Sequence, residues 1–239
     1  MDTAVRAASD QSNLSESVYE QLVDLIVSGD IADGESVGAL GVSKRLGVSR
    51  SPAHTAILRL EADGLVSFGS DRQARVISVT RERVFEVYEM RKILEAAAAD
   101  RAAGHMTLAE TQPLRARLRE LAPGGQTSPG GADPRLTQWA EIDEAFHTTI
   151  AEGSGLPSLA RDIARYRLVH RAMNRSFMPP EKLGDAIAEH LAILNAVEAR
   201  DPAAARERML AHLEAWQRHF IERAADRSGG QDSKHSKEE

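Results

Sequence analysis

The residues of this 239-residue chain with the clearest potential for chemistry are one aspartate and three histidines in its second half. Asp143 and His147 are four positions apart in the segment EIDEAFHTTI, so on a helix they lie on the same face. His190 (AIAEHLAIL) and His212 (ERMLAHLEAW) each lie in a separate segment of helical pattern. If these helices converge inside a bundle, one carboxylate and three imidazoles form the kind of ligand set that holds zinc, nickel, iron or manganese. The alternative for each histidine taken singly is an ordinary surface or core position.

Composition excludes several other classes of site and partner. The chain has no cysteine, which removes disulfides, thiol catalysis and thiolate metal ligands. Its 30 Lys and Arg against 36 Asp and Glu give a formal charge of -6, which excludes a uniformly basic coating protein. No stretch approaches the ~20 apolar residues of a membrane helix, and the first residues lack a signal-peptide pattern. We therefore expect a cytoplasmic protein without a membrane partner.

The spacing of apolar residues predicts a mainly α protein with two domains. Helical spacing occurs in the segment from Val18 to Ile26 and recurs in residues 84–103 and 187–199. The exception is 65–79, where β-branched residues alternate around the turn-like GSDRQ and predict a short hairpin. We expect one domain over residues 14–80 and an all-α antiparallel helical bundle over 81–226. Segments poor in apolar residues or rich in Gly and Pro are expected to form disordered tails at 1–13 and 227–239 and a loop at 122–135.

The first domain has the element order of a winged helix-turn-helix. A short helix at 40–46 ends at Gly47, and the next helix is expected to start at Ser51, which can cap it, with Pro52 in its first turn. This second helix runs to about Asp63, and the hairpin follows. In such an arrangement the N-terminal residues of the second helix meet the major groove of DNA. The inward-facing residues of this helix are expected to be Ala53, Ala56, Ile57 and Leu60.

Local charge supports contact with DNA. Residues 40–80 hold six cations against three acids, whereas the first 39 residues hold one cation, Arg6, and eight acids. For each of these cations alone, a solvated surface side chain is the ordinary interpretation. Together with their position beside a capped helix and a hairpin tip, they favour a DNA-binding surface. The residues assigned to it are Lys44, Arg45, Arg50, Ser51, His54 and Arg72.

The first domain resembles the DNA-binding domain of GntR-type bacterial transcriptional regulators. The match is dense over residues 46–66, LGVSRSPAHTAILRLEADGLV. The resemblance implies that Ser49, Arg50 and Ser51 approach bases and phosphates and that Arg72 lies on the wing. The chain departs from the family pattern at His54, where the family usually has an arginine, and at Gln73, where the wing has a glycine. Histidine cannot reproduce the bidentate readout of guanine by an arginine fork.

The second domain resembles the FCD domain of the FadR-like subfamily. The matching segments are VYEMRKILE at 87–95, Asp143 with Phe146 and His147, Glu189–Ala196, and Ala205–Leu213. The resemblance implies a divalent metal held by Asp143, His147, His190 and His212, with zinc as the leading choice and nickel, manganese or iron as alternatives. It also implies that Arg91 lies near a pocket for a small organic acid or sugar acid, because a guanidinium pairs well with a carboxylate. Further polar contacts to the effector are expected from Arg167, His170 and Asn174, for which a solvated helix face is the alternative.

These features predict a transcription factor, which we expect to be a repressor. It would bind a palindromic DNA operator as a homodimer, because a two-fold protein meets two half-sites. A small carboxylate effector would shift the protein between DNA-competent and incompetent arrangements. One alternative is a mononuclear metal-dependent enzyme that uses the Asp and His ligands, although no positioned base or nucleophile motif is evident. The other is a constitutive DNA-binding dimer that has no effector.

Overall fold

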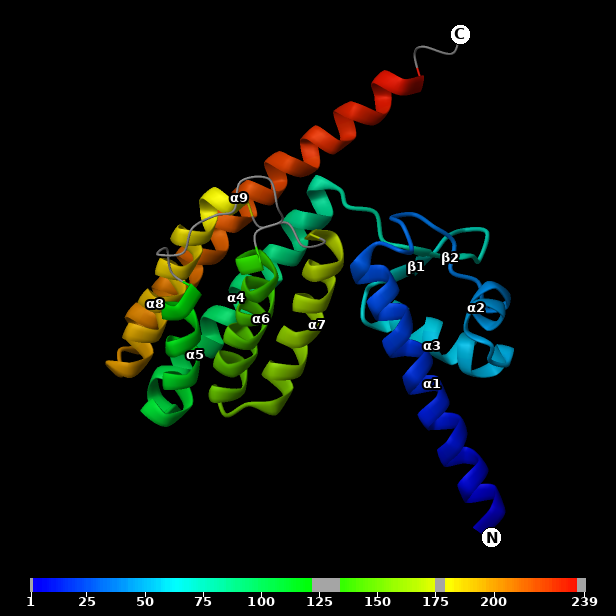
Figure 1. Ribbon diagram of the computed structural model, residues 1–239, viewed down its shortest axis with the longest axis horizontal. Coiled ribbons are helices and arrows are strands. Elements are labelled where there is room, and N and C mark those ends of the chain that lie inside the picture. The colour runs from blue at the N-terminus through cyan, green and yellow to red at the C-terminus, as the bar shows by residue number, and fades with distance from the viewer. Residues whose placement is uncertain (1, 122–133, 175–178, 236–239) are drawn as a thin grey trace. The chain divides into compact units, whose positions relative to one another are not determined.

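The computed structural model describes residues 2–121, 134–174 and 179–235. The chain divides into two compact units (Figure 1). The first holds the residues up to Val79 together with the end of one later helix, from Leu168 onward. The second holds the other described residues from Thr80 onward. No helix in the described part of the chain is long and apolar enough to span a membrane.

The first unit is a winged helix-turn-helix, as predicted. Its elements are α1 (Asp2–Ser28), α2 (Ala39–Leu46), α3 (Arg50–Ala62), β1 (Val66–Phe68) and β2 (Ala74–Val76). The two strands pair antiparallel around the turn 69–73, with Val66 opposite Val76, and Ser36 adds an isolated bridge to Arg75. The core of this unit lies where α1 packs against α3, and it includes Leu22 and Ile26, neither of which is exposed to solvent.

The turn between α2 and α3 depends on two local features. Gly47 ends α2 in the left-handed conformation (φ 68°), which glycine adopts without the steric cost of a Cβ. Ser43 Oγ then donates to the carbonyl of Val48 at 2.7 Å, which closes the turn. The helix α3 begins at Arg50 with Ser49 at the N-cap, so the predicted cap, Ser51, lies two residues too late. The prediction took Pro52 as the first residue of the helix. In the structure Pro52 is the third residue of α3, because proline is tolerated throughout the first helical turn.

The inward stripe of α3 is confirmed. Its four predicted members, Ala53, Ala56, Ile57 and Leu60, are each at most 2% exposed. The residues at the start of α3, including Arg50 and His54, are exposed. The helix therefore buries one face in the unit and presents its N-terminal turn to solvent.

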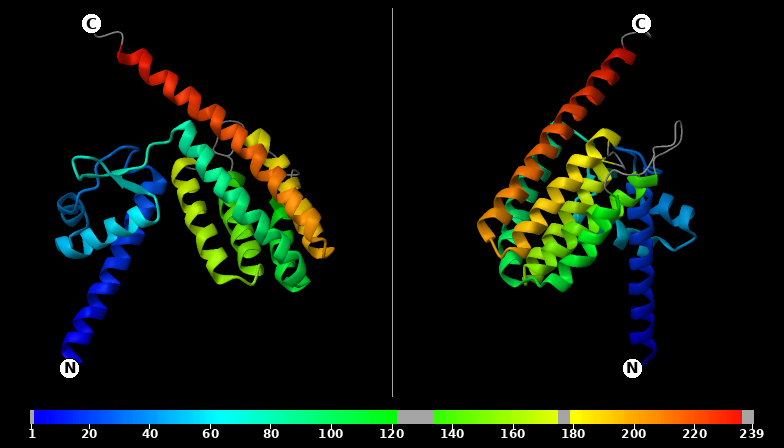
Figure 2. Two further views of the ribbon diagram at one scale, coloured as in Figure 1. Left: turned by 180° about the vertical axis from the view of Figure 1, so that it is seen from behind. Right: turned by 60° about the vertical axis from the view of Figure 1, so that its left-hand side comes forward.

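The second unit is an all-helical bundle, which confirms the predicted fold class. Its elements are α4 (Arg81–His105), α5 (Leu108–Leu121), α6 (Pro134–Gly153), α7 (Pro157–Asn174), the 3-10 helix η1 (Pro180–Lys182), α8 (Leu183–Glu198) and α9 (Pro202–His235). The last part of α7 is grouped with the first unit. Helices α4 and α9 run antiparallel and side by side (Figure 2). Small buried residues of α4, among them Ala96, Ala99 and Ala103, allow its neighbours to approach closely.

The structure differs from the sequence-based prediction at the expected tails and loop. Residues 2–13 continue α1 and residues 227–235 continue α9, where disordered tails were expected. Each extension grows from a helix that is already anchored, and propagation adds one backbone hydrogen bond per residue without requiring burial. The expected loop at 122–135 ends earlier, because Pro134 opens α6, a position that proline favours. The rest of that loop, residues 122–133, lies outside the described residues, as do residues 236–239 of the C-terminal tail.

Candidate functional site

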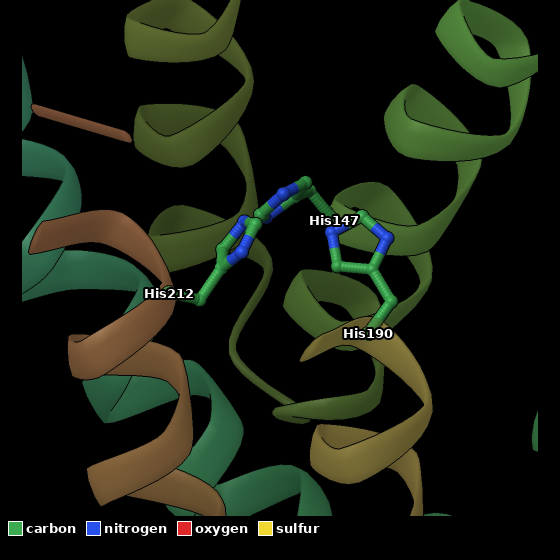
Figure 3. Close-up of side chains that lie close together, drawn as sticks. All are labelled: His147, His190 and His212. Atoms are coloured by element: carbon green, nitrogen blue, oxygen red, sulfur yellow. The ribbon is translucent and has the colours of Figure 1, made fainter. Parts of the chain in front are cut away.

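Three buried histidines from three helices meet in the second unit. His147 lies on α6, His190 on α8 and His212 on α9, and each offers a ring nitrogen within 4.8 Å of the other two (Figure 3). Their exposed fractions are 1%, 0% and 4%. The structure thus brings together the three histidines that the sequence singled out, and we call this group the histidine centre.

Asp143 lies beside the histidine centre, one helical turn before His147. Its Oδ1 is 3.6 Å from Nε2 of His147 and 3.6 Å from Nε2 of His190. The spacing of four residues on α6 therefore places the carboxylate and the imidazole on one face, as predicted. All four predicted metal ligands are close together in the structure.

Aromatic rings enclose His190. Phe146 stacks on its imidazole at a centroid distance of 3.9 Å, and Trp139 stacks at 4.9 Å. Burial, with the neighbouring His212 ring as a further cause, holds the pKa of His190 well below its ordinary value. Burial also lowers the pKa of His212. The neutral imidazole, which is the form that binds metal, is therefore favoured at both positions.

The donor atoms of the centre fit a divalent metal. Nε2 of His147 and both ring nitrogens of His190 are buried and have no hydrogen-bond partner among the described residues. A buried polar atom without a partner costs about 1–3 kcal/mol. Three neutral imidazoles and one carboxylate are a donor set that zinc, nickel, iron and manganese accept. A metal ion bound between these side chains would give one nitrogen of His147 and one nitrogen of His190 a partner.

Two glutamates contact the outer nitrogens of two histidines. Glu95 on α4 accepts through Oε2 from Nδ1 of His147, and Glu189 on α8 accepts from Nδ1 of His212 at 2.7 Å. Carboxylates in this position fix the orientation of metal-binding histidines. Neither glutamate was predicted to have a role. The available signal was their place in the matching segments, since Glu95 ends VYEMRKILE and Glu189 precedes His190.

The predicted effector residue Arg91 is paired with a carboxylate. Its Nε donates to Oε1 of Glu95 at 2.6 Å, and both side chains are 2% exposed. Burial alone would raise the pKa of Glu95, but Arg91 and His147 together hold it well below its ordinary value. Arg91 is thus connected to the histidine centre through Glu95.

Arg167 approaches the centre from α7. Its Nη2 donates to Oδ2 of Asp143 at 2.8 Å and to Oε2 of Glu144 at 2.7 Å. Burial opposes ionisation of Asp143, and Arg167 outweighs it, so the pKa of Asp143 lies well below its ordinary value. The Nε and Nη1 atoms of Arg167 are buried and have no hydrogen-bond partner among the described residues. These two nitrogen atoms of the buried guanidinium therefore lack a hydrogen-bond acceptor among the described residues.

The other two predicted effector residues lie further along α7. His170 is half-buried. Asn174 is the last residue of the helix, and its side chain is outside the described residues. Their assignment to the effector site stays a prediction.

The predicted DNA-contacting residues are exposed on the first unit. Two lie in the last turn of α2, four lie at or near the N-terminus of α3, and one lies in the hairpin turn; they are Lys44, Arg45, Ser49, Arg50, Ser51, His54 and Arg72. Arg72 has a left-handed backbone (φ 58°), a conformation that costs a non-glycine residue about 1–2 kcal/mol. Glycine would adopt this conformation at the wing tip without that cost.

Two of the six cations counted in residues 40–80 are paired with acids. Arg59 forms an ion pair with Glu16 of α1 and lies over the ring of Tyr19 at 3.8 Å. Arg75 donates to Asp71 at 3.0 Å. These two side chains therefore contribute less to the positive charge available for DNA than their number predicts. Lys44, Arg45, Arg50 and Arg72 make no ion pair with a described residue, and they carry the positive charge of this surface.

Comparison with known families identifies both units. Residues 14–76 match the family of bacterial regulatory proteins called the gntR family, and residues 86–215, over half of the chain, match the FCD domain. The chain belongs to the GntR family of transcription regulators and carries an FCD domain as its second unit. The predicted family is confirmed. The family consists of transcription regulators and not of enzymes, which excludes the metal-dependent enzyme considered above.

Similar proteins agree with this assignment. The HTH-type transcriptional repressor RspR of Escherichia coli is 27% identical over 205 residues, which cover 84% of this chain and 86% of RspR. The HTH-type transcriptional regulator YdhC of Bacillus subtilis is 26% identical over 196 residues, which cover 82% of this chain and 85% of YdhC. The solved structure of E. coli McbR/YncC has the same fold, with a TM-score of 0.70, 20% identity, and coverage of 88% of this chain and 98% of that one.

Proposed function

We propose that this regulator is a repressor whose operator binding responds to a small carboxylate bound beside a metal ion at the histidine centre. The observation that carries the proposal is the convergence of three buried imidazoles, of which His147 and His190 each have an Nε2 atom without a hydrogen-bond partner among the described residues. Asp143, His147, His190 and His212 would hold the metal, with zinc as the first choice. A bound divalent ion supplies positive charge and open coordination positions for an anionic ligand.

The chemistry of Arg167 supports a carboxylate as the effector. A guanidinium pairs with a carboxylate through two parallel hydrogen bonds. Arg167 already uses Nη2 on Asp143 and Glu144, while Nε and Nη1 are buried without a partner. Its contact with Asp143 places this side chain next to the proposed metal. Small organic acids and sugar acids therefore form the effector class we propose.

The first unit supports binding to a duplex operator. Its exposed cations Lys44, Arg45, Arg50 and Arg72 lie on α2, α3 and the wing, which are the elements that meet the grooves in a winged helix-turn-helix. Contacts of arginine and lysine with phosphates make such binding sensitive to salt. Chromosomal DNA as the target implies that the protein acts in the cytoplasm.

We also propose that the operator is palindromic and that the regulator binds it as a homodimer. Helix α4 exposes apolar side chains in the second unit, since Ile93 is 61% and Phe85 51% exposed. The half-buried Met90 and Ala97 lie three residues before and four residues after Ile93, on the same face of the helix. Covering this face with the same face of a second copy would give the isologous contact of a two-fold dimer.

The experiment measures metal content and operator binding together. Protein purified without a histidine tag is expected to carry about one metal per chain, and His147→Ala and His212→Ala are expected to lose it. His219→Ala is the matched control, because His219 lies on α9 outside the histidine centre. Carboxylic and sugar acids are then screened by thermal shift, with and without chelator, and active acids are tested for release of the operator in a gel shift.

The outcomes separate the parts of the proposal. An acid that stabilises only the metal-loaded protein and changes operator retention supports it. Wild-type protein without metal, and with stability indifferent to chelator and acids, would leave a constitutive DNA-binding dimer. Operator retention unchanged in Arg50→Ala would contradict the assigned DNA-binding surface.

A further inference from the structure

The two glutamates behind the histidine centre use their oxygens differently. Glu95 engages two partners with two oxygens, because Oε1 accepts from Nε of Arg91 and Oε2 accepts from Nδ1 of His147. Glu189 engages two partners with one oxygen, since Oε2 accepts from Nδ1 of His212 at 2.7 Å and from Nε1 of Trp216 at 3.2 Å. The difference decides how each histidine would respond to the loss of its carboxylate.

An ionised carboxylate has no proton to donate, so it takes part in hydrogen bonds only as an acceptor. Arg91, fully buried beside Glu95, always donates and thereby keeps the carboxylate in that state. The hydrogen bond to Glu95 therefore requires that Nδ1 of His147 carries the proton. In a neutral ring the lone pair then lies on Nε2, the buried atom that has no partner and lies 3.6 Å from Asp143.

We propose that Glu95 is a positioning residue that sets the tautomer of His147, and that Arg91 acts through Glu95 instead of contacting an effector. The pair Arg91–Glu95 keeps Nε2 of His147 free as a metal ligand. The role of the tautomer in metal binding rests on the proposed metal site. The tautomer itself is a property of the metal-free protein and can be measured without a metal.

An amide at position 95 inverts the hydrogen bond to His147. Glutamine has one acceptor oxygen and one donor NH2 group. Arg91 can only donate, so in Glu95→Gln it takes the oxygen, and the NH2 group faces His147. Nδ1 must then accept, the proton moves to Nε2, and the lone pair turns away from the proposed metal.

The same substitution at position 189 has a smaller effect. One amide oxygen can accept two hydrogen bonds, as Oε2 of Glu189 does. In Glu189→Gln, His212 and Trp216 keep their acceptor, and Nδ1 of His212 keeps its proton. The two glutamates are therefore distinguishable by an identical change.

A double variant tests the role of Arg91 directly. In Arg91→Met/Glu95→Gln the amide oxygen no longer has to serve the guanidinium. It can accept from Nδ1 of His147 again, which restores the tautomer. The double variant also avoids a buried guanidinium without its carboxylate, so it is expected to fold where the single variant is strained.

The experiment reads the tautomers by long-range 1H–15N NMR of the imidazole rings in metal-free protein near neutral pH. Wild type is expected to show His147 protonated at Nδ1 and unprotonated at Nε2, and Glu95→Gln the reverse. Metal affinity, measured by competition with a chelating dye for zinc, is expected to fall about 10–100-fold in Glu95→Gln. It should fall less than about threefold in Glu189→Gln and return to within a few-fold of wild type in the double variant. Glu89→Gln is the control, since Glu89 is an ion-paired glutamate on the same helix.

A proton on Nε2 of His147 in the metal-free wild type overturns the inference. So does zinc affinity in Glu95→Gln equal to that of wild type, or a double variant as weak as the single one. If Glu95→Gln does not fold, the spectra of wild type and of the double variant still decide. If wild type binds no metal at all, the metal part of the proposed function fails, while the spectra still test the tautomer.

Discussion

Replacing His190 by leucine should affect the metal-free and the metal-loaded protein in opposite ways. His190 is fully buried between Phe146 and Trp139, and neither ring nitrogen has a partner among the described residues. Removing two such atoms relieves about 1–3 kcal/mol each. Losing two aromatic stacking contacts costs about 0.5–1.5 kcal/mol each. In the presence of chelator, the stability of His190→Leu is therefore expected to equal that of wild type or to exceed it by about 2 kcal/mol, which is unusual for a substitution in a protein core.

Zinc should reverse the order of stability. A metal at one hundred times its dissociation constant stabilises the folded protein by about 2.7 kcal/mol. For a protein of this size, that corresponds to an increase in Tm on the order of 5–11 °C. The leucine variant lacks one ligand and should lose most of this increase.

The assay is thermal unfolding followed by circular dichroism, with chelator and with excess zinc. His219→Leu is the control, because it removes a histidine of α9 that lies outside the histidine centre; it should keep the zinc response. Two results would refute the reasoning. One is a loss of more than about 2 kcal/mol in the metal-free variant, in the range of ordinary substitutions in a packed core. The other is a zinc response as large as that of wild type.

Three further predictions concern other parts of the protein. Arg72→Gly removes the steric cost of the left-handed backbone at this position, so Tm should stay level or rise. Operator affinity should fall, and its salt dependence in a gel-shift series should weaken by about one phosphate contact. Unchanged affinity would show that Arg72 makes no contact with DNA. Burial lowers the pKa of His190 and His212 in the folded protein below 6.5. As the pH falls through that value, the unfolded chain therefore takes up more protons than the folded protein, and the metal-free protein should lose stability below about pH 6.5. Denaturant titrations measure this loss, and a free energy of unfolding that stays constant down to about pH 5 would contradict it. Ile93→Asp places a charge on the exposed apolar face of α4 and should yield monomers in sedimentation experiments, whereas an intact dimer would place the contact elsewhere.

The architecture and the histidine centre could be predicted because their signals are local. Helical spacing, the glycine after α2 and the turn-like GSDRQ indicate the winged helix-turn-helix without knowledge of distant contacts. The spacing of Asp143 and His147 places both on one face of α6. The convergence of His190 and His212 on that face was implied by the family resemblance and not by spacing.

Two of the contacts that could not be predicted from the sequence join residues far apart in the chain. Glu95 and His147 are separated by 52 positions, and Arg59 pairs with Glu16 across 43. No periodicity within one helix shows which acid will lie against which base. For this reason Arg59 was counted among the cations that favour DNA binding, whereas the structure pairs it with Glu16. The pair Arg91–Glu95 has the four-residue spacing at which helical side chains meet, and it was missed because the family resemblance assigned Arg91 to the effector.

The two tryptophans of the chain both lie at the histidine centre. Trp139 stacks on His190, and the indole of Trp216 donates to Glu189, which accepts from His212. The DNA-binding unit up to Val79 contains no tryptophan. Intrinsic indole fluorescence should therefore report ligand binding in the helical unit alone. A paramagnetic ion such as nickel, bound at the centre, should quench this emission, which would allow metal and effector titrations on the unlabelled protein.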